Sequence, residues 1–69
     1  MSFYRLYCRD RDGHFSGVID FEARSEAQAL RMADRMCWRE KRELWHDSSL
    51  LMQWDGQRRL AGSAKPQPG

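Results

Sequence analysis

Near its start the chain reads Phe3-Tyr4-Arg5-Leu6-Tyr7-Cys8, continues through Asp10-Arg11-Asp12-Gly13, and returns with Val18-Ile19-Asp20-Phe21. An Asp-Gly step between two runs that favour β-structure predicts a hairpin, because glycine supplies the positive φ that a tight turn needs. We expect strands over residues 2–9 and about 15–23. The alternation of the first strand places Tyr4, Leu6 and Cys8 on a core face and leaves the other face open.

A helix is predicted after the hairpin. Ser25-Glu26-Ala27-Gln28 fits a capping box, in which the Ser25 hydroxyl accepts a bond from a backbone N–H and Gln28 reaches back to the cap residue. We expect this helix to end between Trp38 and Lys41, where basic residues suit the negative end of the helix dipole. Its apolar stripe consists of Ala29, Leu30, Ala33, Met36 and Cys37, which recur at helical spacing.

Two further strands are predicted over residues 42–46 and 50–54, and Asp55-Gly56 stops the second. The composition then becomes polar, so residues 57–69 are expected to form a disordered tail behind a single domain of residues 1–56. The predicted fold is therefore α+β, in the order ββαββ, with a four-stranded, mostly antiparallel sheet and one helix packed on one face. A right-handed crossover makes the third strand parallel to the second, and if the first strand lies between them the strand order is 2-1-3-4.

Length and charge limit the function. A chain of 69 residues buries only a small core, which leaves little room for an enclosed substrate cavity. Twelve Lys and Arg residues oppose ten Asp and Glu residues, and the net charge of +2 is too small to require a nucleic acid partner. No apolar signal core follows Met1, and no apolar run approaches the ~20 residues that span a bilayer, so a cytoplasmic location is expected.

No catalytic or metal site is predicted. The donor types of a zinc site are present in Cys8, His14, Cys37 and His46. No two of these residues have the close spacing of C-x₂-C or H-x₃-H, so we expect no metal or other cofactor. A nucleophile pair of Cys37 with His46 would lack an oxyanion hole and an orienting third group. Asp10 and Asp12 flank a turn, where aspartates ordinarily bond local backbone, so a non-enzymatic protein is expected.

The two cysteines are expected to lie close together. Cys8 is on the core face of the first strand, and Cys37 is on the apolar stripe of the helix, so both point into the same layer. We predict free, buried thiols, because a reducing compartment keeps thiols reduced and buried cysteine is ordinarily a small hydrophobe. The alternative is a redox switch, which requires an accessible thiolate of low pKa.

Aromatic and arginine side chains on the open sheet face suggest a binding surface, because these residue types are enriched at binding hot spots. The predicted partner-binding residues are Phe3, Arg5, Tyr7, Arg9, Trp38 and Trp45. We expect a small protein-interaction or regulatory module whose partner is a protein or a second copy, and no membrane or small-molecule substrate. In the alternative interpretation the tail, through Leu60, folds back over one of the exposed tryptophans.

A nucleic-acid-binding regulator is the alternative function. Arg31, Arg35 and Arg39 recur at i+4 on the helix face opposite the core, where they could straddle phosphates. Asp34, Glu40 and Glu43 lie within reach, and a face of mixed charge is usually only solvated. The aromatic and arginine residues of the sheet could also stack on bases.

Five short stretches occur in an order that resembles a known group of proteins. They are Tyr4-Arg5-Leu6-Tyr7, Asp10 with Gly13, Asp20-Phe21-Glu22-Ala23, Ser25-Glu26-Ala27 and Glu43-Leu44-Trp45. The chain resembles small uncharacterised bacterial proteins, common in alphaproteobacteria, that carry a Tyr-Arg-Leu-Tyr strand, one helix and a Glu-Leu-Trp strand. The resemblance covers residues 3 to about 54 and implies the same fold pattern, but it implies no activity and no functional residue.

Overall fold

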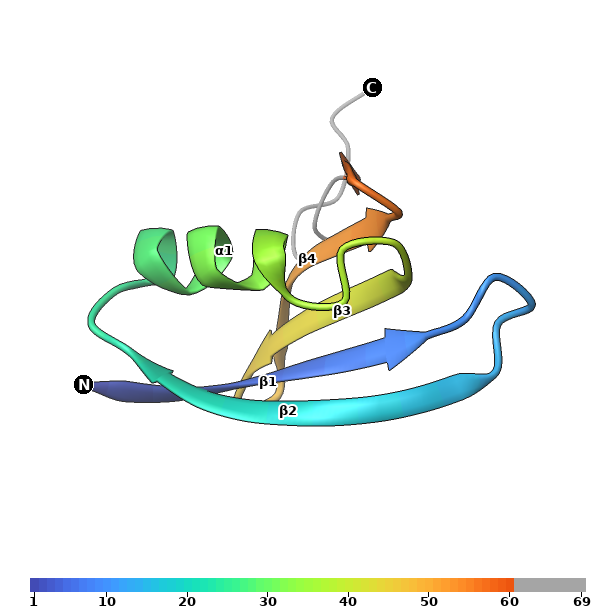
Figure 1. The fold of residues 1–69 in the computed structure, drawn as a ribbon. Helices are drawn as coiled ribbons and strands as arrows, with labels where there is room; N and C mark the ends of the chain where they lie inside the picture. The colour runs from blue at the N-terminus through green and yellow to red at the C-terminus, as the bar shows by residue number, and fades with distance from the viewer. Residues whose placement is uncertain (61–69) are drawn as a thin grey trace, which may run out of the picture.

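The computed structural model describes residues 1–60, which form one sheet and one helix (Figure 1). The elements are β1 (Ser2–Arg9), β2 (Phe15–Ala23), α1 (Glu26–Arg35), β3 (Lys41–His46), β4 (Ser49–Asp55) and β5 (Arg58–Leu60). Neighbouring strands are antiparallel in the order β2-β1-β3-β4-β5. The α+β class, the single helix and the order of the first four strands are confirmed. Figure 1 shows α1 along one side of the sheet, with no described element on the opposite side.

The sheet has five strands, so the prediction of four is wrong. β5 pairs with β4 in the register Gln53↔Leu60, Trp54↔Arg59 and Asp55↔Arg58. Gly56 adopts φ +65° and forms with Gln57 the two-residue turn between β4 and β5, where the sequence predicted only the end of a strand. The predicted tail is therefore ordered as a strand over residues 58–60, and its remainder, residues 61–69, lies outside the described residues.

The first hairpin forms as its sequence predicts. One oxygen of Asp10, Oδ1, accepts hydrogen bonds from the backbone N–H groups of Asp12 and His14, each at 2.9 Å. Gly13 adopts φ +86° and donates its N–H to the carbonyl of Asp10 at 3.0 Å. Asp10 thus bonds local backbone, as expected for an aspartate in a turn.

The helix begins at the predicted cap and ends early. The Ser25 hydroxyl accepts from the N–H of Gln28 at 3.1 Å, while Gln28 Oε1 accepts from the N–H of Arg24 and not from that of the cap residue. Regular helix stops at Arg35, because Met36 is extended and Cys37 turns into the left-handed region at φ +48°. The prediction of an end between residues 38 and 41 is therefore wrong. In the part of the chain described, no helix has the length and apolar character needed to cross a membrane.

The core lies between α1 and the sheet. Tyr4, Leu6 and Cys8 are buried on the helix side of β1, as predicted from the alternation of that strand. Ala29 and Ala33 of the helix are fully buried, and their small side chains let α1 approach the sheet closely. Since the core occupies one side of the sheet, the opposite side is available for function.

Candidate functional site

Five of the six residues predicted to bind a partner lie together on the uncovered side of the sheet. The odd-numbered residues of β1 point away from α1, and β1 is flanked by β2 and β3. Trp45 of β3 lies opposite Arg5 in the register. Directly opposite residues of neighbouring strands share a face, so the structure gathers Phe3, Arg5, Tyr7, Arg9 and Trp45 on what we call the open sheet face.

The open sheet face is hollowed on both sides of a shared aromatic pair. A hollow of about 430 Å³ is lined by Phe3, Tyr4, Arg5, Tyr7, Asp20, Trp45 and Asp47. A second hollow, of about 440 Å³, includes Tyr7 and Trp45 again and extends to Arg9 and Glu43. The two hollows form one continuous surface, because both contain the side chains of Tyr7 and Trp45.

Polar contacts hold the charged members of this face in place. The Arg5 guanidinium donates from Nε to Asp20 Oδ1 at 2.7 Å and from Nη2 to Asp20 Oδ2 at 3.1 Å. These paired hydrogen bonds raise the pKa of Arg5 and lower the pKa of Asp20, so both groups are charged at neutral pH. Nε1 of Trp45 donates to Glu43 Oε1 at 3.2 Å, which orients the indole ring.

Two apolar residues of this face were missed by the sequence prediction. Val18 lies opposite Tyr7 in the register and is exposed. Phe15 is exposed, and its ring centroid lies 6.4 Å from that of Tyr7. The pairing register of the hairpin identifies Val18, but the contact of Phe15 depends on a bulge between Cys8 and Arg9 that the sequence does not reveal.

Trp38 does not belong to the open sheet face. It lies in the turn after α1 and is 43% exposed, with the Arg39 guanidinium 4.7 Å from the centroid of its ring. Its hollow is shared with Asp34 and Arg59, on the side of the sheet that the helix occupies. Leu60 lies opposite Gln53, on the open sheet face, so this residue does not cover Trp38.

The predicted arginine stripe of the helix is interrupted. Arg31 and Arg35 are exposed on α1, but Arg39 lies beyond the last helical residue and therefore is not in line with them. Asp34, which was expected to balance the stripe, is bound instead to Arg59 of β5. The helix thus presents only Arg31 and Arg35, one turn apart, of the three arginines that the alternative function needs.

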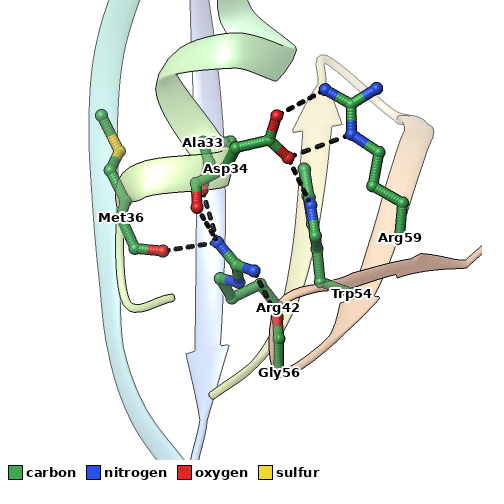
Figure 2. Close-up of polar contacts among 7 residues, drawn as sticks. All are labelled: Ala33, Asp34, Met36, Arg42, Trp54, Gly56 and Arg59. Atoms are coloured by element: carbon green, nitrogen blue, oxygen red, sulfur yellow. Dashed lines mark hydrogen bonds and ion pairs between the residues drawn. The ribbon is translucent and has the colours of Figure 1, made fainter. Parts of the chain in front are cut away.

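A buried arginine explains the early end of α1 (Figure 2). Arg42 is only 2% exposed, and its Nη1 donates to the carbonyl oxygens of Ala33, Asp34 and Met36 at 2.6, 3.1 and 2.8 Å. Its Nη2 donates to the carbonyl oxygen of Gly56. Carbonyls in the last turn of a helix lack partners within the helix and carry the negative end of the dipole. Arg42 therefore caps the helix and was missed, although it shares the alternation phase of buried Leu44.

Asp34 connects the helix to the last two strands (Figure 2). Its Oδ1 accepts from Trp54 Nε1 at 2.8 Å and from Arg59 Nε at 3.0 Å, and its Oδ2 accepts from Arg59 Nη2 at 2.6 Å. The bonds from Arg59, and then that from Trp54, hold the pKa of Asp34 below its usual range. Because every described partner of Asp34 is a fold-forming side chain, we assign this cluster to stability.

The two cysteines meet as predicted, but Cys37 has a different position. The sulfur atoms of Cys8 and Cys37 lie 2.7 Å apart, and both thiols are free. Cys8 is buried on β1, whereas Cys37 is only half-buried and lies in the turn after α1, so the prediction that both are buried is wrong for Cys37. Burial, followed by the contact with Cys37, raises the pKa of Cys8 to about 12.

The candidate zinc ligands fall into separate places. Among the described residues, Cys8 and Cys37 approach Glu40, and His14 approaches Asp10 and Asp12. His46 instead stacks on Tyr4, with ring centroids 4.7 Å apart.

No family model, curated protein or solved structure matches the chain. The resemblance to small bacterial proteins therefore stays a prediction, and the function has to be inferred from the residues themselves.

Proposed function

We propose that the protein is a small, non-enzymatic interaction module that binds a protein partner, either another chain or a second copy, through the open sheet face. The observation that supports this most is the continuous hollowed surface around Tyr7 and Trp45, on a side of the sheet that no other described element covers. An open sheet face with shallow hollows suits the broad contact of a protein better than an enclosed small ligand.

The apolar content of the face supplies the anchors of such an interface. Phe3 is 67% exposed at one end of β1, and Val18 and Phe15 are exposed on β2 toward the other end of the same hairpin. Large exposed apolar side chains grouped on one side of a small protein mark an interaction surface. Tyr7 and Trp45, which are half-buried, are already held by neighbouring groups and lose little conformational entropy on binding.

The charges of the face favour a protein over a nucleic acid. The register places acidic and basic residues alternately across the open sheet face: Asp20, Glu22, Glu43 and Asp55 against Arg5, Arg9, Lys41 and Arg58. Asp47, which lines both hollows, adds a fifth negative charge to these four, so the face has no positive field that would attract a phosphate backbone. Mixed charges around apolar anchors are the composition of a protein interface rim.

The test compares variants on the two sides of the sheet. The double variant Phe3→Ala/Tyr7→Ala removes two anchors of the open sheet face, and Trp38→Ala removes an exposed aromatic ring from the helix side as a matched control. Each immobilised protein is used to capture partners from a lysate of the source cells, and its self-association is measured by sedimentation. We expect partners or self-association to be retained by Trp38→Ala and weakened at least tenfold in the double variant. Equal binding by both variants, or no specific association by the unaltered protein, would contradict the proposal.

The second candidate is binding of single-stranded nucleic acid, which the neighbouring Tyr7, Trp45 and Arg9 side chains favour, since bases stack on aromatic and guanidinium groups. The balanced charge of the face and the interrupted helix stripe weaken this proposal. A mobility shift with generic RNA and DNA at low salt distinguishes the two candidates. A complex that weakens steeply as salt rises would favour the nucleic acid.

A further inference from the structure

We propose that Cys8 and Cys37 form a reversible intramolecular disulfide by exchange with a low-molecular-weight disulfide such as that of glutathione. The site lies on the helix side of the sheet, away from the open sheet face, and its test is independent of the proposed function.

The fold brings the two sulfurs into contact from distant parts of the chain. They are separated by 29 positions in the sequence, and their Sγ atoms lie 2.7 Å apart. Cys8 is fixed on β1, between β2 and β3, and Cys37 is fixed in the turn whose preceding carbonyls bind Arg42. Both segments are held by hydrogen bonds, so the contact between the two sulfurs belongs to the fold itself.

The backbone of Cys37 is a second, independent observation. Cys37 adopts φ +48° directly after the helix cap, a position that glycine usually occupies because other side chains adopt it at a cost. The turn itself needs only that backbone conformation, which glycine would provide more readily. A cysteine in this position places its sulfur against Cys8, so the side chain has a use that the turn does not explain.

The unequal exposure of the two thiols sets the order of events. Cys37 is half-buried and can be reached from solvent, whereas Cys8 is 1% exposed. A small disulfide therefore meets Cys37 first. Cys8 is accessible only to the sulfur that it already touches, which makes it the resolving thiol.

The surroundings favour a disulfide over a bound metal. Arg42 lies opposite Cys8 in the register, and its buried cation would repel a divalent ion. Glu40 is the third donor within 4.8 Å of both sulfurs, and its Oε1 already accepts a hydrogen bond from Ser16 at 2.7 Å. A tetrahedral zinc site needs four donors, and among the described residues only the two thiols and the already bonded Glu40 carboxylate lie together.

The reaction balances in two steps. The Cys37 thiol loses its proton to water, and the thiolate attacks one sulfur of glutathione disulfide; the S–S bond of that disulfide breaks and one glutathione thiolate leaves and takes a proton. Cys8 then attacks the Cys37 sulfur and passes its proton to the second departing glutathione. Two protein thiols are oxidised by two electrons to one disulfide, and glutathione disulfide is reduced to two molecules of glutathione.

The experiment measures the thiol–disulfide equilibrium of the full chain. The protein is equilibrated with defined ratios of reduced and oxidised glutathione, free thiols are trapped by alkylation, and the products are weighed by mass spectrometry. We expect one intramolecular disulfide, with an equilibrium constant at least tenfold larger in native buffer than in concentrated guanidinium chloride, because the fold holds the sulfurs together. The oxidised chain should unfold about 10 °C or more above the reduced one.

Two variants report the roles of the individual thiols. Cys8→Ala should stop at a mixed disulfide of Cys37 with glutathione, and Cys37→Gly, which suits the backbone, should remain unmodified because Cys8 is buried. The proposal is overturned if native protein is no more readily oxidised than denatured protein, if it collects two glutathiones, or if added zinc is held by both thiols and blocks the exchange.

Discussion

Arg42 is a buried cation whose described partners are all backbone carbonyl oxygens, three of them at the end of α1. A charge removed from water destabilises a fold unless hydrogen bonds replace its solvation. Here the cation also lies at the negative end of the helix dipole, and its guanidinium lies 4.8 Å from the ring centroid of Trp54. Arg42 thus supplies hydrogen-bond donors that the next helical turn would otherwise provide, and it connects α1 to β3.

Replacing Arg42 with methionine should destabilise the protein by about 3 kcal/mol or more, because helix carbonyls lose their donors in a buried place. The stability of Arg42→Lys should lie between those of the unaltered protein and Arg42→Met, since an ammonium cannot reproduce the planar arrangement of donors. Urea denaturation measures both, with Arg31→Met on the exposed face of the helix as the matched control, expected within about 0.5 kcal/mol of the unaltered protein. An equal loss in Arg42→Met and Arg31→Met would contradict the capping role.

Asp34 should make stability depend on pH in the acid range. Its pKa is lowered in the folded state, so its contribution is present above the unfolded value of about 3.9 and is lost as the pH falls through the lower folded value. At neutral pH we expect Asp34→Asn to cost about 1 to 2 kcal/mol, since the group is partly exposed.

The measurement for Asp34 is the free energy of unfolding at neutral and at acid pH. The gap between Asp34→Asn and the unaltered protein should close in acid, while exposed Asp55→Asn should show little gap at either pH. A gap of the same size at both pH values would show that Asp34 acts by packing and not by its charge.

At the scale of elements, the predictions succeeded where the signal is local. The Asp10–Gly13 turn and the Ser25 cap are each encoded within a few residues, and both formed as expected. The end of α1 depends on Arg42, a residue seven positions after Arg35 in another element, so helical spacing alone extended the helix too far. That extension also included Trp38 in the predicted helix, whereas Trp38 lies in the turn after α1.

In the candidate site, too, the features that local sequence encodes were predicted and those that depend on distant residues were missed. Period-two alternation was sufficient to place Phe3, Arg5 and Tyr7 on one face, because a strand's side chains alternate regardless of its neighbours. The cluster around Asp34 requires knowledge of β5, whose two arginines and short length resemble a polar tail. To predict the charge balance of the face one must also know the pairing register, because the register decides which charged residues share that face, and the composition does not reveal it.

The fifth strand gives a prediction at this scale. A chain that ends after Gly56 loses Arg59 and uncovers the edge of β4, so we expect it to lose about 2 kcal/mol of stability relative to a chain that ends after Leu60. The fluorescence of Trp54, which is 2% exposed, should shift to the red as its cover is removed. Equal stability of the two chains would show that β5 contributes nothing to the fold, as expected for a tail that is disordered from residue 57.

In the whole molecule, one side of the sheet provides most of the stabilising contacts and the other side is exposed. The helix side contains the core, the Arg42 and Asp34 contacts and the cysteine pair, and these contacts account for the stability of a small domain. The open sheet face contributes charge pairs that are exposed to solvent, which stabilise little. Its exposed apolar side chains are therefore better explained by binding than by folding.

The most direct test of this account is photo-crosslinking from single positions. A photoreactive phenylalanine analogue replaces Phe3 on the open sheet face in one protein and Trp38 on the helix side in another, and both are irradiated in the source cells. We predict specific crosslinks to a protein, or to a second copy of this chain, from position 3 and few from position 38. Crosslinks that arise mainly from position 38, or that join position 3 to nucleic acid, would contradict protein binding through the open sheet face.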